Sequence, residues 1–346
     1  MIAFLITRMV PGGPLEKAIM EARMGAAAEG VSAVTSAGSE IPQEALDALK
    51  EAYDLDKPWY QAYFLWLKKL VTFDMGESYT YREPVSSLII ERFPVSIYFG
   101  LTGFTLAYLV SIPLGIQKAI RHGSKFDFFT SAAVFVGYSI PGWAMGALLL
   151  VLFAGGQFLD WFPLGGFRST AYDELPALVK DWEDPDSVED EYGTFQWEQM
   201  SLPGKIVDQV YHTILPVFCY MLGSFASLTV LMKNSLMENL GQDYVRTAFA
   251  KGLTPRRVIY IHVLRNSLIP LATGLGHALG IIMAGSYLIE AVFNINGLGL
   301  LGFKAIVGRD YTIVMGILSI NIMLTLIGNI LSDILYAVID PRIRFQ

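Results

Sequence analysis

The chain has 346 residues, of which 53% are hydrophobic and only 16% are charged, and its mean hydropathy is positive. This composition is too apolar for a surface covered by water, so it predicts an integral membrane protein and excludes the ordinary soluble classes. The single cysteine, Cys219, excludes a disulfide framework and a thiolate metal cluster, and the net charge of −7 is unevenly distributed along the chain.

Residues 1–10 are apolar but few. At a rise of about 1.5 Å per residue they cover roughly half of a bilayer, so we interpret them as the remnant of a first transmembrane helix whose N-terminal half is missing. A short or re-entrant segment is the alternative. No cleavage site of a signal peptide follows. Residues 11–94 are then predicted to form a periplasmic segment.

Residues 95–346 form the predicted transmembrane domain. A membrane-spanning helix needs about 20 mostly apolar residues. Proline and glycine occur within the runs of this length, which is tolerated when neighbouring helices satisfy the freed backbone groups. The predicted spans are 95–117, 128–153, 213–232, 269–293 and 311–338.

Basic residues are concentrated in alternate connections between these spans. Eleven Lys and Arg residues lie in segments 118–125, 233–265 and 342–344. The connection 156–211, on the opposite side, has three basic residues and twelve carboxylates. Because Lys and Arg accumulate on the cytoplasmic side, we expect the loop 233–268 and the C-terminus in the cytoplasm, and the acidic loop 156–211 in the periplasm.

Seven carboxylates lie among the eleven residues 181–191 of this acidic loop. Such a run is typical of a solvated, poorly ordered surface segment, which is the interpretation we favour. Contact with a basic patch of a binding protein, or with a cationic substrate, is the alternative.

Gly297, Gly299 and Gly302 spell GxGxxG, the dinucleotide-binding fingerprint. The fingerprint works only between a strand and a helix of a βαβ unit, whereas these glycines follow a predicted span. We therefore predict tight turns between helices. The four histidines have no metal-ligand spacing, and no hydrolase or zinc-protease motif occurs, so we expect no catalytic residue, no cofactor and no metal.

Three ionisable residues lie in or near the spans. His277 is inside one and suits a hydrogen bond between helices, while Glu290 and Asp333 lie near span ends, where water or a capping partner is within reach. Without an acid–base chain at the membrane midplane, a proton-driven carrier has little support.

The loop 233–268 has a helix–glycine–helix pattern. Residues 242–251 predict a short helix with Tyr244, Ala248 and Lys251 roughly along one face. Gly252 is expected to end it in the left-handed conformation, and Thr254-Pro255 to start a second helix as N-cap and first residue. From charge alone, this pair of helices could equally lie against anionic lipid.

The motif inside the loop is more specific than its charge. Residues 247–252, TAFAKG, followed by His262, Arg265, Asn266 and Pro270, resemble the "EAA" loop of ABC importer permeases, in the peptide/nickel branch of binding-protein-dependent permeases. Asn296 and residues 309–311 point to the microcin C/oligopeptide-type (Yej-like) members. The resemblance continues through 11–14, 53–58, 73–78, 84–85, 94–96, 139–141, 290–299 and 340–342.

This resemblance implies an all-α integral membrane protein with the type I ABC importer permease fold, a six-helix family core whose first helix is truncated here. It also implies a second homologous permease, two cytoplasmic ABC ATPase domains, a periplasmic substrate-binding protein and a peptide substrate, in a bacterial inner membrane and without nucleic acid. The chain itself would catalyse no bond chemistry. The residues assigned to the ATPase-coupling loop are Tyr244, Ala248, Ala250, Lys251, Gly252, His262 and Arg265.

The substrate stays open within the family, among dipeptides, oligopeptides, microcin-like peptide–nucleotides, nickel chelates and glutathione. The alternative from a different class is a stand-alone secondary carrier or channel that uses the basic loop as a lipid anchor.

Overall fold

The computed structural model describes residues 1–9, 56–156, 158–190, 194–272 and 286–339. Most of the predicted periplasmic segment 11–94, the middle of the predicted span 269–293 and His277 lie outside the described residues. Within them the named elements are all helices. The chain divides into two compact units, residues 1–91 with 301–320 and residues 92–300 with 321–346. Each unit is described by itself.

The first unit has a small aromatic core. Helices α1 (Ile2–Met9) and α4 (Trp59–Val71) contribute Phe4 and Ala62, and the beginning of α17 (Tyr311–Ile339) contributes Met315. The ring of Phe4 lies 5.4 Å from that of Tyr63. The aromatic side chains Tyr63 and Trp66 of α4 therefore pack against this core.

Asp310 fixes the start of α17 in the same unit. Its carboxylate accepts hydrogen bonds from the hydroxyl of Ser78 at 2.7 Å, from the backbone N–H of Thr80 at 3.0 Å and from that of Ile313 at 3.3 Å. The last bond satisfies a free donor in the first turn of the helix. The side chain is buried, so one carboxylate both caps α17 and holds residues 78–80.

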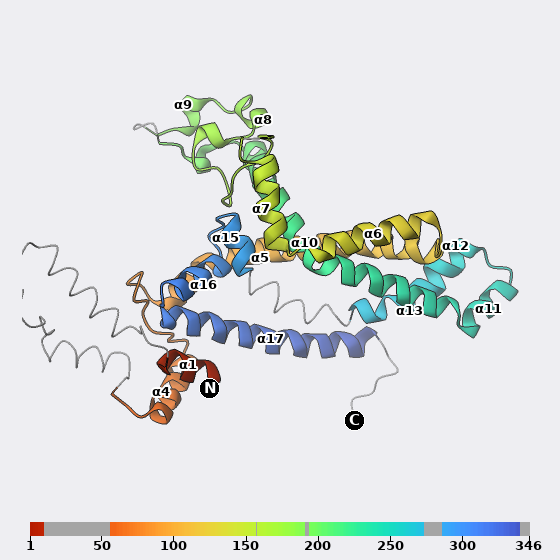
Figure 1. The fold of residues 1–346 in the computed structure, drawn as a ribbon, viewed down its shortest axis with the longest axis horizontal. Helices are drawn as coiled ribbons and strands as arrows, with labels where there is room; N and C mark the ends of the chain where they lie inside the picture. The colour runs from red at the N-terminus through yellow and green to blue at the C-terminus, as the bar shows by residue number, and fades with distance from the viewer. Residues whose placement is uncertain (10–55, 157, 191–193, 273–285, 340–346) are drawn as a thin grey trace, which may run out of the picture. The chain divides into compact units, whose positions relative to one another are not determined.

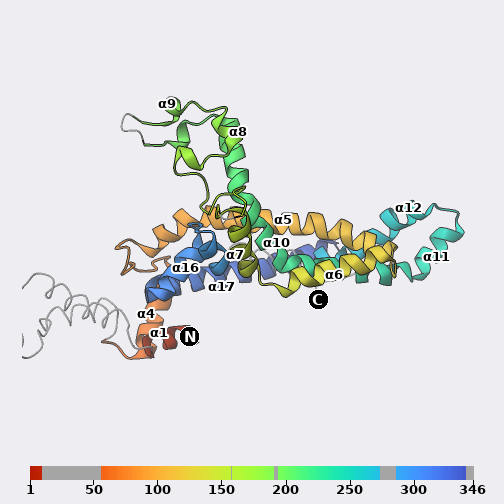
Figure 2. The same cartoon turned by 45° about the horizontal axis from the view of Figure 1, so that its top comes forward.

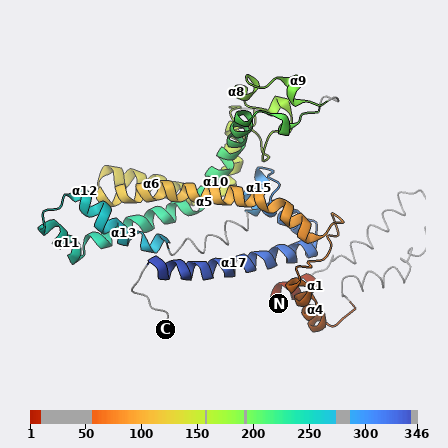
Figure 3. The ribbon, with the colours of Figure 1, turned by 180° about the vertical axis from the view of Figure 1, so that it is seen from behind.

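The second unit is built around α10 (Leu202–Leu240), which packs along α6 (Lys125–Ser139) and α7 (Gly142–Phe153). Figure 3 shows α5 (Val85–Ile120) running beside them. Helices α5, α10 and α17 are long and apolar enough to cross a membrane, and α6 with α7 could form a fourth crossing. They contain the predicted spans 95–117, 213–232 and 311–338.

The predicted span 128–153 is not one straight helix. It is divided between α6 and α7, which are bent by 95°. Proline disfavours the helical conformation of the preceding residue, and Ile140, before Pro141, is extended at φ −103° and ψ 119°. Figure 1 shows that α10, which contains Pro216, turns at the same level and stays beside both helices.

Glycine makes close packing possible at this bend. A Cβ on Gly142 would lie 2.7 Å from the carbonyl oxygen of Cys219 on α10, and one on Gly146 would lie 2.8 Å from the ring of Phe293. Real Cβ atoms do not come this close to such neighbours. The break therefore depends on proline for its direction and on glycine for its contacts.

The acidic loop is folded where the structure describes it, so the expectation of poor order at 181–191 is wrong for residues 181–190, although Asp181 and Asp184 are exposed to solvent as expected. Val188, at the end of α9 (Pro185–Val188), packs with Val179 of α8 (Ala177–Lys180) in a small core. The buried carboxylate of Glu183 accepts hydrogen bonds from the backbone and hydroxyl of Ser201, the N-cap of α10. Figure 2 shows α8 beside the upper end of α10.

A second buried carboxylate holds the rest of this loop to α10. Asp208 accepts from the hydroxyl of Ser169 at 2.6 Å and from the indole N–H of Trp197 at 2.9 Å. It is fully buried. Ser169 precedes the acidic residues 181–191 and Trp197 follows them. Asp208 therefore holds the two ends of the loop together.

The contact between α5 and α10 gives a test of the fold. A Cβ on Gly115 would lie 2.6 Å from Cβ of Met232 and 2.9 Å from the carbonyl oxygen of Thr229. We expect Gly115→Ala to destabilise the protein by about 1–3 kcal/mol through overpacking. The matched control is Gly223→Ala on α10, where a Cβ meets nothing within 4 Å and alanine is the better helix former. Thermal unfolding of both variants in detergent is the measurement; equal transition temperatures would contradict this packing.

Candidate functional site

The basic loop lies between α10 and the helices that follow it. Helix α10 extends through residues 233–240, so the loop begins later than the predicted 233. It contains α11 (Asp243–Ala250), α12 (Pro255–Arg257), the π-helical segment η3 (Val258–Val263) and α13 (Leu264–Ser267). Figures 1 and 3 show α11 and α12 at the end of α10, near the start of α6.

The predicted helix–glycine–helix order is confirmed. Gly252 follows α11 with φ +77°, in the left-handed region. Thr254 is extended and precedes Pro255 at the start of α12, but its side chain makes no capping hydrogen bond. The turn is therefore set by the backbone conformations of glycine and proline.

Helix α11 has two different faces. Val245 and Ala248, three residues apart, are buried. Tyr244, Phe249, Ala250, Lys251 and Gly252 are exposed. Tyr244 is fixed by a hydrogen bond from its hydroxyl to Oδ1 of Asn239 at 3.0 Å. Of the residues predicted to share a face, Ala248 thus points into the chain's own core, whereas Tyr244 and Lys251 are accessible.

The buried face of α11 rests on a cluster that we call the seat. It joins α11 to η3, to α10 and to the end of α5, and neither His262 nor Arg265 is part of it, since both are exposed. The buried members of the seat are Ile116, Ala119, Met232, Leu236, Val245, Ala248, Val258, Val263 and Leu271. Helix α11 is therefore in direct contact with the two long helices α10 and α5, and a movement of α11 would act on both.

Hydrogen bonds tie the far side of the seat to those helices. Ser235 of α10 donates to the carbonyl oxygen of Ser267 at 2.9 Å, and Ser267 donates to the carbonyl oxygen of Val263 at 2.9 Å. Both serines are buried. The hydroxyl of Tyr108 on α5 donates to the carbonyl oxygen of Leu271 at 3.1 Å. The backbone at the C-terminal end of the loop is thereby anchored to α5 and α10.

A buried ionic group lies beside the seat. Asp127, at the start of α6, accepts from the ammonium of Lys233 on α10 at 2.7 and 2.8 Å, and its carboxylate lies 3.2 Å from Nζ of Lys118 on α5. Lys118 also donates to the hydroxyls of Thr130 and Ser131. One carboxylate thus joins three helices. No residue spacing in the sequence indicated this ionic group.

Glu290 forms a second node within the same unit. Its side chain is fully buried and accepts from the hydroxyls of Ser96 at 2.9 Å and Tyr220 at 3.2 Å, and from the backbone N–H of Leu300 at 2.9 Å. The last bond caps the start of α16 (Leu298–Val307). We predicted that Glu290 and Asp333 would each meet water or a capping partner. Glu290 has the capping partner, and Asp333 is exposed.

Two of the GxGxxG glycines, Gly297 and Gly299, lie at this node. The predicted tight turn is wrong for Gly299 and Gly302, because both lie inside α16. A Cβ on Gly297 would lie 2.4 Å from Oε2 of Glu290, and one on Gly299 would lie 2.7 Å from the carbonyl carbon of Ser286. These two glycines allow the start of α16 to reach the buried carboxylate. Among the described residues no group of three or more His, Cys, Asp or Glu side chains is arranged to hold a metal ion.

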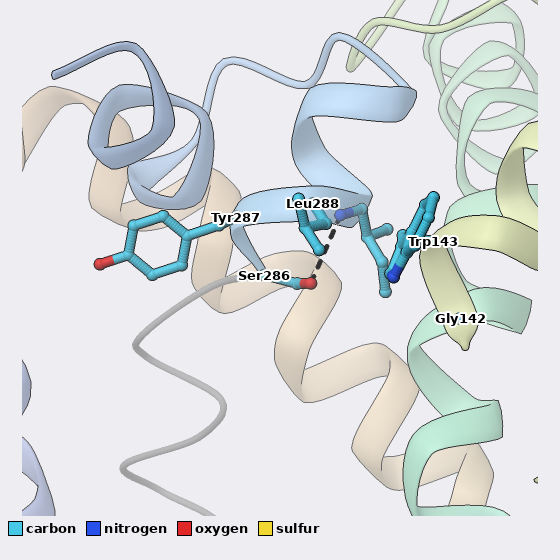
Figure 4. Close-up of a pocket in the computed structure, with 6 residues that line it drawn as sticks. Gly142, Trp143, Ser286, Tyr287 and Leu288 are labelled. Atoms are coloured by element: carbon cyan, nitrogen blue, oxygen red, sulfur yellow. Dashed lines mark hydrogen bonds between the residues drawn. The ribbon is translucent and has the colours of Figure 1, made fainter. Parts of the chain in front are cut away.

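A pocket of about 340 Å³ lies at the break between α6 and α7. It is lined by Gly142 and Trp143 from the start of α7 and by residues 286–289 at the start of α15 (Tyr287–Val292). Figure 4 shows Trp143 on one side and Tyr287 with Leu288 on the other, and the hydroxyl of Ser286 accepts from the backbone N–H of Ile289 at 3.4 Å. The pocket is apolar and contains no titratable pair.

The chain belongs to the family of binding-protein-dependent transport system inner membrane components, whose model matches residues 111–345. The matched region contains the basic loop, the seat and the buried carboxylates of Asp127 and Glu290. The chain is accordingly a transport permease of the membrane, with the all-α fold implied by its sequence.

Individual relatives agree along the full length. The inner membrane ABC transporter permease protein YejB of Escherichia coli O157:H7 is 37% identical, covering 100% of this chain and 94% of that protein. The peptidoglycan transport system permease protein YejB of Agrobacterium fabrum is 36% identical, covering 100% and 93%. The oligopeptide transport system permease protein AppB of Bacillus subtilis is 33% identical, covering 88% and 87%.

A solved structure supports the fold. An inward-facing MetNI methionine ABC transporter matches with a TM-score of 0.51 at 15% identity, covering 73% of this chain and 96% of the matched chain. At that identity the likeness concerns the arrangement of helices alone. It places the chain among type I ABC importer permease folds.

The ionic group offers a test with a matched control. Asp127→Asn leaves the buried ammonium of Lys118 and the partly buried ammonium of Lys233 without a carboxylate, so we expect a loss of about 3–5 kcal/mol of stability. Asp243→Asn removes an exposed partner of Arg246 at 3.5 Å, for which we expect a loss of at most about 1 kcal/mol. Thermal unfolding in detergent compares the two; an equally small effect would contradict the bracing role of Asp127.

Proposed function

We propose that this chain is the membrane-spanning permease subunit of an ATP-driven importer of peptides, and that ATP is hydrolysed by separate cytoplasmic subunits. Family membership supports the importer class. The observation that carries the coupling mechanism is the two-faced helix α11, whose inner face rests on the seat and whose outer face is accessible.

We propose the outer face of α11 and the turn after it as the ATPase contact. Tyr244 and Phe249, 38% and 45% exposed, provide apolar surface, and Ala250 and Gly252 are small enough for close seating in a cleft. Lys251, His262 and Arg265 add accessible polar or basic groups nearby in sequence. Ala248 contributes from the inside, because its methyl group packs in the seat and sets how closely α11 approaches α10.

The mechanism is a shift of population between inward-open and outward-open states, driven by ATP bound elsewhere. A push on α11 reaches Met232 and Leu236 of α10 and Ile116 of α5 through direct contacts in the seat. In this arrangement the basic loop and the C-terminus face the cytoplasm and the acidic loop faces the periplasm, in agreement with the distribution of Lys and Arg. A second permease subunit, two ATPase domains and a periplasmic binding protein complete the transporter.

The names of the relatives support a peptide as substrate. They mention oligopeptides in one case and peptidoglycan in another, and short peptides are the chemistry common to both. Nickel chelates and glutathione remain the alternatives within the family.

Gly252 tests the ATPase contact. Gly252 is exposed, and a Cβ there would meet nothing within 4 Å, so a side chain at this position starts in open space on the proposed contact surface. We expect Gly252→Trp to reduce peptide uptake and substrate-stimulated ATPase activity of the assembled complex by about tenfold or more. Gly252→Asn, which tolerates the left-handed conformation, is the control for backbone strain and should retain most activity. Normal coupling in an assembled Gly252→Trp complex would refute the contact.

Reconstitution tests the class of transporter. In liposomes, the chain alone should transport no labelled peptide with or without an ion gradient, whereas the complex with its partner permease and ATPases should transport when ATP is supplied. Gradient-driven uptake by the chain alone would instead establish a secondary carrier. The measurement is accumulation of the labelled peptide over time.

A further inference from the structure

The segment between α12 and α13 contains one residue more per turn than an α-helix. Residues Val258–Val263 form a π-helix, and the N–H of Leu264 bonds to the carbonyl oxygen of Ile259, five residues earlier. The α-helical bond joins residues four apart. Such single π-turns occur within helices mostly as local insertions, frequently at functional sites.

This extra residue decides which side chains enter the seat. Val258 and Val263 are both fully buried there, and they are five positions apart, which is one turn of a π-helix. In an α-helix the residue one turn after Val258 would be His262, which is exposed here. The sequence therefore fits the seat in the π register, and an α register would exchange a buried valine for histidine.

The π-turn lies between the two parts that coupling must connect. On one side, η3 packs against α11. On the other, it continues into α13, where Ser267 is tied to Ser235 of α10 and to the carbonyl oxygen of Val263. Moving from the π to the α register rotates everything after the turn by about 100°, the angle per residue of an α-helix, and this rotation would carry Ser267 away from Ser235.

We propose that the π-turn Val258–Val263 is a register switch which positions α11 against α10, and that its conversion between five-residue and four-residue hydrogen bonds transmits the movement of α11 to α13. The proposal rests on the proposed function, since it assumes that an ATPase moves α11. The chain keeps its helical bonding in both registers, so the switch requires no unfolding.

Deleting Ile261 tests the switch. Ile261 is exposed, and its removal brings the two valines four positions apart, where an α-helix places both in the seat. The variant should therefore fold and assemble with its partner subunits. It should lose substrate stimulation of ATPase activity, and uptake of a labelled peptide should fall by about tenfold or more, because only one register remains.

Ile261→Ala is the matched control, since it removes the same side chain and keeps the residue count; we expect it to couple normally. Spin labels on cysteines introduced at Glu238 and Asn266, both exposed, measure the rotation of α13 against α10. Their distance should change between the nucleotide-free and the ATP-bound, vanadate-trapped complex, and should stay constant in the deletion variant.

Normal uptake and stimulation in the deletion variant would overturn the switch, as would an unchanged label distance in the otherwise unmodified complex. Deleting Tyr260, which is also exposed, gives a second version of the shortened turn. If neither deletion variant assembles, the four-residue register does not fit the seat and the proposal also fails. If the unaltered complex shows no ATP-driven uptake, the proposed function fails, which is a distinct result.

Discussion

Buried carboxylates at the starts of helices organise this protein. Asp310 caps α17, Glu290 caps α16, and Glu183 holds Ser201 at the start of α10. A free backbone N–H in an apolar environment is expensive, and so is an unpaired carboxylate. Bringing the two together satisfies both, and Asp310 and Glu290 also accept hydrogen bonds from a second segment. The ends of the helices are thus fixed by the same bonds that join the helices to their neighbours.

Two of these carboxylates, Asp310 and Glu290, also connect segments that lie far apart in the sequence. Ser78, in the segment 73–78, bonds to Asp310 of the segment 309–311. Ser96, of the segment 94–96, bonds to Glu290 and also accepts from the N–H of Leu298. Two pairs of the dispersed motifs that suggested a permease are therefore partners in space, and each of these pairs is joined by buried hydrogen bonds.

The sequence was informative where a local rule applied. Apolar length located α5, α10 and α17, and the left-handed preference of glycine located the turn at Gly252. It was uninformative where the outcome depended on distant partners. Nothing local distinguishes Asp127 from a solvated carboxylate, since its counter-charges lie on α5 and α10. The local charge of the acidic loop likewise suggested a solvated segment. The loop folds because Val179 and Val188 pack in a small core and Asp208 accepts hydrogen bonds from Ser169 and Trp197. The π-turn is hidden because one extra residue leaves the apolar pattern nearly unchanged.

The division of α11 into two faces has a consequence for which of its side chains can change independently. Val245 and Ala248 pack against residues of their own chain, so their size and shape are constrained by packing within the permease. On the accessible face, the hydroxyl of Tyr244 is tied to Asn239 of α10, so a change at Tyr244 alters the exposed surface and the end of α10 together. Phe249 is exposed and lies outside the seat, so a change there leaves the packing of Val245 and Ala248 unaltered. The two aromatic side chains of one short helix are therefore under different constraints.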